Sequence, residues 1–227
     1  MVHYFGQSPR FVGKSTSSNE QDRLRHVQRV LDNLRSQKGL DVNVCGISGR
    51  SLVPVDIDFL GLDNPEMLVY ESLNRLVDHL ADYDYFMVVE DDILVPAQVL
   101  ANIMAFDREH ALNECLHPNR LEYREGGIDC VDLRAMPGWT GPRTTFRGID
   151  LCVAQNPHSG FLMLSRDKLA YGLEQTDRAF RGRFLGGYME SAFAHYHRPF
   201  LLFRPYENLE FHTIVHLDHW LGPDAWG

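Results

Sequence analysis

The sequence predicts a Rossmann-like α/β fold with a mostly parallel central sheet flanked by helices. Apolar runs typical of strands alternate with segments of helical periodicity along the first half of the chain. The run YFMVV at 85–89 is apolar without alternation, as in a strand that is buried on both faces. The order strand, helix, strand, helix, strand is typical of a parallel sheet covered by helices.

The first expected strand is VHYFG, and a turn-rich segment follows it. A helix is expected to begin at Ser18, which forms a capping box with Gln21, and to stop at Gly39. The spacing of its apolar residues places four of them on one helical face: Leu24, Val27, Leu31 and Leu34.

Two further strands are expected in DVNVCGIS and VPVDIDFLGL. Asn64-Pro65 then opens a second helix, because proline is favoured at the first helical position. Its apolar stripe consists of Val69, Leu73, Leu76, Val77 and Leu80. The YFMVV strand closes this alternating half of the chain.

The second half is less regular. Residues 110–157 are rich in glycine and proline without clear periodicity, and we expect an ordered loop region that borders a site. A strand and a Ser165-capped helix follow in HSGFLMLSRDKLAYG, and GGYMESAFAHYH predicts a helix with Glu190 near its start. We expect one domain over 1–227, with a nucleotide-binding half (1–95) and a second half (96–227).

Composition restricts the class of protein. Of 227 residues, 44% are hydrophobic and 23% are charged, as in ordinary soluble globular proteins. The net charge of −9 gives no general attraction to nucleic acid, and no apolar run is long enough for a transmembrane segment. The four cysteines are scattered without a C-x-x-C pair, which indicates a reduced, cytoplasmic protein.

Three adjacent acids, Glu90, Asp91 and Asp92, directly follow the YFMVV strand. Ligands of open parallel sheets bind beyond the carboxyl ends of the strands, so these acids are expected at such a site. Adjacent carboxylates repel one another unless a cation neutralises them, and oxygen ligands suit Mn²⁺ or Mg²⁺. The alternative is a solvated acidic turn after a strand.

A P-loop is a competing interpretation. SPRFVGKS, at 8–15, matches the Walker A spacing, except that Ser8 replaces the first glycine. A P-loop helix begins at the Gly-Lys-Ser itself, whereas the capping box here places the helix start at Ser18. This interpretation predicts ATP binding through Lys14.

The string VVEDDILVP resembles the DxD motif of the GT-A family of nucleotide-sugar-dependent glycosyltransferases. Further segments are similar to family motifs in the same order along most of the chain: YESLNRLVDHL, HSGFLMLSRDKL, GYMESAF and IVHLDHWLG. The whole chain is also similar to a bacterial GT-A-like protein. The resemblance implies a GT-A fold and transfer of a sugar from a UDP-sugar to an acceptor hydroxyl on a saccharide, lipid or protein.

The resemblance also implies roles for single residues. Asp92, Asp91 and His216 would bind Mn²⁺ or Mg²⁺, and Glu190 would be the catalytic base that takes the proton of the acceptor hydroxyl. The donor would be bound by Tyr4, Gly6, Arg75, Glu90, Asp91, His158 and Gly160. Whether transfer inverts or retains the anomeric configuration stays open. The alternative to a transferase is a protein that binds UDP and metal without transferase activity.

Overall fold

The computed structural model describes residues 1–3, 20–124, 127–130 and 139–218. Its helices are α1 (Glu20–Arg35), η2 (Pro65–Met67), α2 (Leu68–Arg75), η3 (Leu76–His79), α3 (Ala97–Glu109), α5 (Arg166–Gln175) and α6 (Tyr188–His197). Its strands are β1 (Cys45–Gly46), β2 (Ile57–Asp58), β3 (Tyr85–Val89), β4 (Ile93–Leu94), β5 (Glu114–Leu116), β6 (Asn119–Arg124), β7 (Gly127–Cys130), β8 (Trp139–Phe146), β9 (Ile149–Ala154), β10 (Phe161–Ser165), β11 (Leu201–Pro205) and β12 (Thr213–His216).

These strands form short mixed sheets rather than one long parallel sheet. Their orders are β1-β2, β10-β3, β5-β11-β9-β8 and β4-β12-β6-β7. Antiparallel pairing joins β3 to β10, β9 to both β8 and β11, β4 to β12, and β6 to β7. The result is a mixed α/β structure with a curled half-barrel, so the prediction of a Rossmann-like GT-A sheet is wrong.

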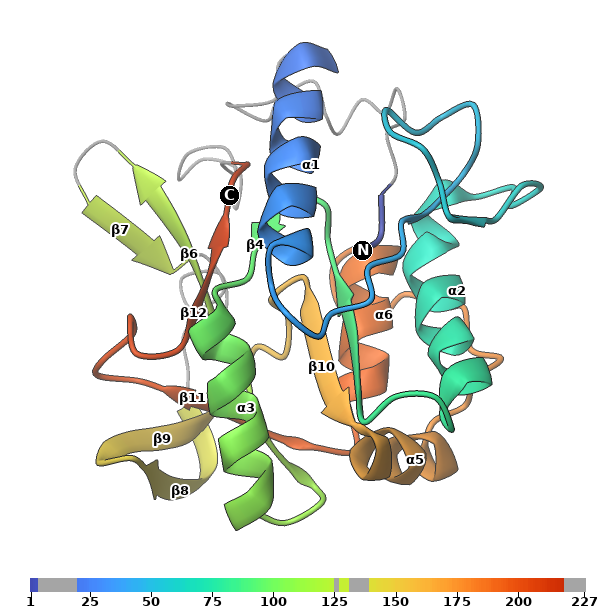
Figure 1. The fold of residues 1–227 in the computed structure, drawn as a ribbon. Helices are drawn as coiled ribbons and strands as arrows, with labels where there is room; N and C mark the ends of the chain where they lie inside the picture. The colour runs from blue at the N-terminus through green and yellow to red at the C-terminus, as the bar shows by residue number, and fades with distance from the viewer. Residues whose placement is uncertain (4–19, 125–126, 131–138, 219–227) are drawn as a thin grey trace.

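The prediction of a parallel sheet failed because an apolar run indicates that a strand is buried but does not give the direction of its neighbour. The YFMVV strand is buried on both faces, as predicted: Phe86 and Val88 pack toward α2 and α6, whereas Val89 packs toward α1 and α3 (Figure 1). Burial on both faces does not fix the direction of the neighbouring strand, and β10 pairs with β3 in antiparallel register. Among the first strands, parallel order persists in the two-residue β1–β2 pair and in bridges from Val2 to Cys45 and Glu90.

The capping residues in the sequence predicted where two helices begin. Asn64 Oδ1 accepts a hydrogen bond from the Glu66 amide at 3.1 Å, and Pro65 occupies the first helical position. Ser165 Oγ accepts from the Lys168 amide at 3.3 Å and begins α5. These two predicted helix starts are confirmed, while the expected cap at Ser18 lies outside the described residues.

The buried face of α1 differs from the predicted one. Val27, Leu31 and Leu34 are buried as expected, but Leu24 is 39% exposed. Arg23 is only 5% exposed and takes the inward position one turn before Val27. A charged side chain therefore enters the interior from α1.

Residues 110–157, which were expected to form a loop region, contain strands β5 to β9. The β8–β9 hairpin turns at Arg147 and Gly148, both with positive φ, and its register shifts between Thr140 and Arg143.

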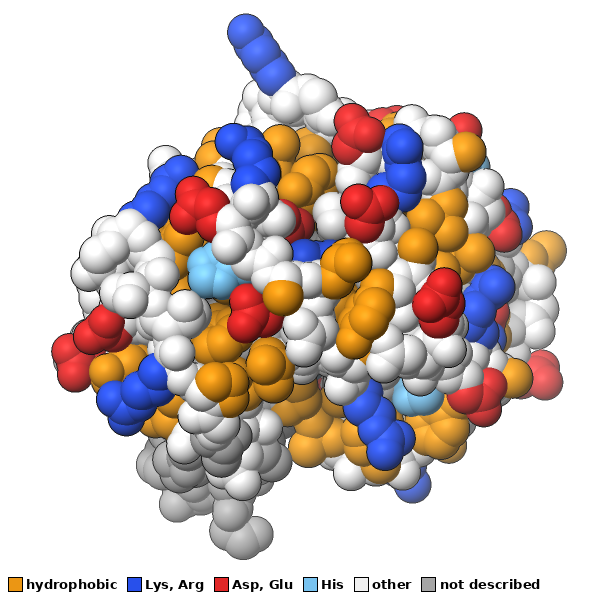
Figure 2. All heavy atoms as spheres, turned by 90° about the horizontal axis from the view of Figure 1, so that it is seen from below, with side chains coloured by type: hydrophobic (Ala, Val, Ile, Leu, Met, Phe, Trp, Pro, Cys, Tyr) orange, Lys and Arg blue, Asp and Glu red, His pale blue; other side chains and the backbone are white. Residues whose placement is uncertain are grey.

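Figure 2 shows the molecule from below relative to Figure 1. On this face, apolar patches are interspersed with charges of both signs.

Two further features concern the chain as a whole. All four cysteines are buried and not disulfide-bonded, one each in β1, β5, β7 and β9. None of the helices among the described residues combines the length and the apolar character that crossing a bilayer requires.

Candidate functional site

The three acids lie in the tight turn between β3 and β4. The Glu90 amide donates to the Gly160 carbonyl at 2.9 Å, and the Leu217 amide donates to the Asp92 carbonyl at 2.8 Å. Glu90, Asp91 and Asp92 are 9%, 5% and 3% exposed. A solvated acidic turn is therefore excluded, and the buried charges need partners.

Arg23 is the principal partner. Its guanidinium donates to the carboxylates of both Asp91 and Asp92, the latter at 3.0 Å, and lies 3.6 Å from Asp218 Oδ2. Burial opposes the charge on Arg23, but Asp91 and Asp92 outweigh this effect and raise its pKa. The α1 helix thus supplies a resident cation to the turn.

Two histidines complete the compensation of the aspartates. The Leu52 amide donates to His3 Nε2 at 3.0 Å, so His3 Nδ1 carries the proton and donates to Asp91. His216 lies with Nδ1 2.7 Å from Glu122 Oε1 and Nε2 3.5 Å from Asp92 Oδ2. Burial opposes the charging of His216, but Asp92 and the bond to Glu122 prevail and raise its pKa.

Glu90 faces the backbone at Gly160. Gly160 has φ +68°, and a Cβ built there would lie 2.5 Å from Glu90 Oε2, so another residue would strain the backbone and displace the Glu90 carboxylate. Burial and the neighbouring charge of Asp92 raise the pKa of Glu90 to about 7, although Arg120 acts in the opposite direction. The carboxyl therefore changes charge near neutral pH.

His158 forms hydrogen bonds with two arginines. An Arg120 N–H donates to His158 Nε2 at 3.3 Å, and Arg204 donates to the His158 carbonyl at 2.8 Å. Burial, together with the charges of Arg120 and Arg204, lowers the pKa of His158 well below its usual value. His158 is consequently a neutral acceptor that orients Arg120.

Glu190 caps its own helix. Its Oε2 accepts from the Gly187 amide at 2.9 Å at the start of α6. Its charge is also among the causes that raise the pKa of Glu90, which places it near the acidic turn. The Glu190 carboxylate, which was expected to act as a base, thus already accepts a hydrogen bond that caps α6.

The structure brings together most of the described residues that were predicted for the site. The group at the acidic turn contains Glu90, Asp91, Asp92, His158, Gly160 and His216, with Glu190 nearby. Arg75 is not part of it: its guanidinium pairs with Asp78 at 3.1 Å and lines another cavity. Tyr4, Gly6 and the P-loop segment 8–15 lie outside the described residues.

Five residues at or beside the acidic turn were not predicted: Arg23, His3, Arg120, Glu122 and Asp218. Arg23 had a signal, because it lies four residues before Val27 on a face that is otherwise apolar. A charge at such a position requires a buried counter-charge. Glu122 lies on β6, in the segment expected to be loop, so nothing in its surroundings in the sequence marked it.

The expected metal ions can be tested against this arrangement. In the described ranges, no group of three or more His, Cys, Asp or Glu side chains is arranged to hold a metal ion. Arg23 occupies the carboxylates of Asp91 and Asp92. In this arrangement the residues do not fit Mn²⁺ or Mg²⁺, because a divalent ion would have to displace a buried guanidinium.

Comparison of the chain with protein-family models, with curated proteins and with solved structures gave no match. The resemblance to glycosyltransferases therefore rests on the short motifs described above.

Proposed function

We propose that this chain is a glycosyltransferase that uses a UDP-sugar donor, with its donor site at the acidic turn between β3 and β4. The observation behind the proposal is a convergence: residues 90–92, 158–160 and 216, singled out as donor-site motifs, meet in one buried cluster. Four cysteines that form no disulfide are in keeping with a cytoplasmic location.

The charges of the cluster supply a chemical basis. Arg23 has a planar guanidinium that can bind phosphate oxygens as it binds carboxylates. A carboxylate has further lone pairs beyond those that accept from Arg23, so Asp91 and Asp92 can accept hydrogen bonds from sugar hydroxyls while they remain paired with it. The acceptor, whether saccharide, lipid or protein, is not specified by these residues.

Calorimetric titration tests the donor site. UDP and ATP are titrated separately, each with and without Mn²⁺, against the wild type and Asp92→Asn. We expect UDP to bind and Asp92→Asn to weaken it at least about tenfold, as for loss of a charged hydrogen bond. Asp78→Asn, at an exposed carboxylate, is the control. Absence of UDP binding under any condition contradicts the proposal, and Mg²⁺-dependent ATP binding in its place favours the P-loop interpretation.

A protein that binds the nucleotide without turnover is the second candidate, and the cap that Glu190 forms on α6 favours it. Glu190→Gln separates the two, because glutamine still accepts from the Gly187 amide but cannot act as a base. A transferase loses UDP-sugar turnover in this variant and keeps UDP binding, whereas a binding protein has no turnover in the wild type. Glu174→Gln, at an exposed position on α5, is the matched control.

A further inference from the structure

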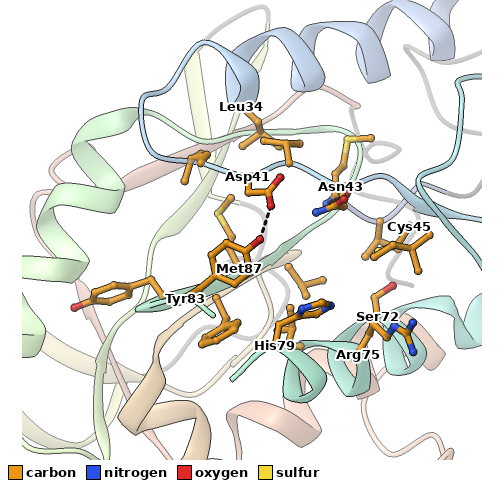
Figure 3. A pocket seen from close by; sticks show the side chains of 18 of the residues that line it. Leu34, Asp41, Asn43, Cys45, Ser72, Arg75, His79, Tyr83 and Met87 are labelled. Carbon is orange, nitrogen blue, oxygen red and sulfur yellow. Dashed lines mark hydrogen bonds between the residues drawn. The ribbon is translucent and has the colours of Figure 1, made fainter. Parts of the chain in front are cut away.

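A cavity of about 400 Å³ lies between the end of α1, the start of β3 and the α2–η3 helix (Figure 3). It reaches β3 along Tyr85–Val88, whereas the acidic turn follows the opposite end of that strand. Its volume is in the range of small-molecule sites, roughly 300–1,000 Å³. The proposed glycosyltransferase site does not include this cavity.

One side of the cavity is apolar. Its lining includes Leu34 from α1, Val42 from the segment before β1, and Phe86 and Val88 from β3. Leu34, Phe86 and Val88 are each no more than 5% exposed, so they form a fixed wall. Such a surface favours a hydrocarbon group over a polar one.

The opposite side presents a row of hydrogen-bond donors. Ser72, Arg75 and His79 all line the cavity, and their spacing of three and four residues places them on one face of the α2–η3 helix. Figure 3 shows these side chains extending from the helix toward the cavity.

Ser72 is the most informative of the three. It is 2% exposed, and its hydroxyl has no hydrogen-bond partner within the part of the chain that the structure describes. A buried hydroxyl without a partner is unfavourable, which points to a ligand that accepts its hydrogen bond. Arg75, one turn further along, adds a positive charge at the same side.

Asp41 also lines the cavity, but its carboxylate is already engaged. Asp41 lies across the cavity and accepts a hydrogen bond from the Tyr83 hydroxyl, as the dashed line in Figure 3 marks. Asp78, the partner of Arg75, has a side chain that is 52% exposed, so water screens this pair. Arg75 can therefore turn to an anion in the cavity at little cost.

We propose that this cavity binds a medium-chain organic monocarboxylate. The carboxylate accepts hydrogen bonds from Ser72 and Arg75, and the unbranched tail lies against the apolar wall formed by Leu34, Phe86 and Val88. A carboxylate matches both the bidentate guanidinium and the single hydroxyl donor.

Calorimetry with hexanoate, octanoate and decanoate on the full chain tests this site. We expect saturable binding at one site, about fourfold tighter for each added CH₂ until the cavity is full. Decanol and decylammonium, which share the tail of decanoate, should bind at least about tenfold more weakly, because they lack the carboxylate charge. Tighter binding of decylammonium would overturn the proposal, since Asp41 would then dominate.

Variants locate the binding. Arg75→Gln should weaken decanoate binding at least about tenfold, as for loss of one charge-assisted hydrogen bond. Arg25→Gln is the matched control, because Arg25 is also exposed and paired three residues away, with Asp22. Val42→Phe fills the cavity and should abolish binding, and a thermal melt verifies that each variant is folded.

Equal effects of Arg75→Gln and Arg25→Gln, or decanoate binding that persists in a folded Val42→Phe variant, would overturn the proposal. So would the lack of any saturable binding of the three acids. These outcomes are independent of UDP titration, so the monocarboxylate site and the donor site can fail separately.

Discussion

Substitution of Gly160 by alanine tests whether the Glu90 carboxylate is fixed against the backbone before β10. The three atoms nearest to the built Cβ all belong to Glu90: Oε2 at 2.5 Å, Cδ at 2.9 Å and Cγ at 3.4 Å. Glu90 is 9% exposed, so its side chain has little space into which to move. The substitution therefore adds both a strained backbone and an overlap.

The two contributions can be estimated separately. A non-glycine residue with positive φ costs roughly 1–2 kcal/mol. Overpacking in a rigid interior adds about 1–3 kcal/mol, so Gly160→Ala should lower the free energy of unfolding by about 2–5 kcal/mol. Gly148→Ala is the control, because Gly148 has a similar φ of +75° and no atom within 4 Å of the built Cβ. It should cost only the backbone strain, about 1–2 kcal/mol.

Urea unfolding, followed by circular dichroism, measures all of these values. In a Glu90→Ala background the overlap disappears, and Gly160→Ala should then cost no more than Gly148→Ala does in the wild type. The double-mutant cycle gives the overlap directly as a coupling energy. Equal costs of Gly160→Ala and Gly148→Ala in the wild-type background would refute the reasoning, because Glu90 would then be free to move away.

Three further predictions concern buried charges. Because the folded-state pKa of Glu90 is raised from 4.5 to about 7, its contribution to stability is present at low pH and is lost as the pH rises through 7. Relative to Glu90→Gln, the wild type should lose up to about 3 kcal/mol between pH 4 and pH 8 in urea titrations, and a pH-independent difference would contradict this. Arg23→Met leaves the two aspartates of the turn without their guanidinium and should cost about 3–5 kcal/mol at pH 7; a loss below 1 kcal/mol would show that other groups compensate them. Asp107→Asn breaks a buried 2.6 Å pair with Lys168 and should cost about 3–5 kcal/mol, whereas Asp78→Asn at an exposed pair should cost about 0–1 kcal/mol. Equal melting temperatures for these last two variants would contradict the role of burial.

Features that depend on neighbouring residues were predictable from the sequence. The helix starts at Asn64-Pro65 and Ser165 follow from hydrogen bonds within three residues, and the structure has both. The direction of strand pairing depends on residues far apart in the chain. β3 and β10 are separated by about seventy residues, and the YFMVV pattern is the same for a parallel and an antiparallel neighbour.

The strands of residues 110–157 escaped prediction because they lack the patterns on which strand prediction depends. β8 contains Gly141 and Pro142, both disfavoured in strands, and an irregular register interrupts its pairing with β9. The half-barrel is built partly from this segment, so the fold class could not be predicted correctly without it.

The site was predictable where it is carried by contiguous motifs. The acids at 90–92 are consecutive, and Gly160 and His216 belong to strings that were singled out by resemblance. Arg23 belongs to no such string, and its pairing with Asp91 spans 68 residues. Charge compensation in a buried cluster is set by three-dimensional packing, so a sequence shows the charges that need partners but not which partners they obtain.

The four buried cysteines can serve as probes of local opening of the structure. Because Cys45, Cys115, Cys130 and Cys152 lie in different strands, a thiol reagent can reach each one only when its part of the structure opens. Pulsed alkylation followed by peptide mass spectrometry would then give a separate opening free energy for the β1–β2 pair and for each four-stranded sheet. The native cysteines alone thus allow the cooperativity between these three sheets to be mapped.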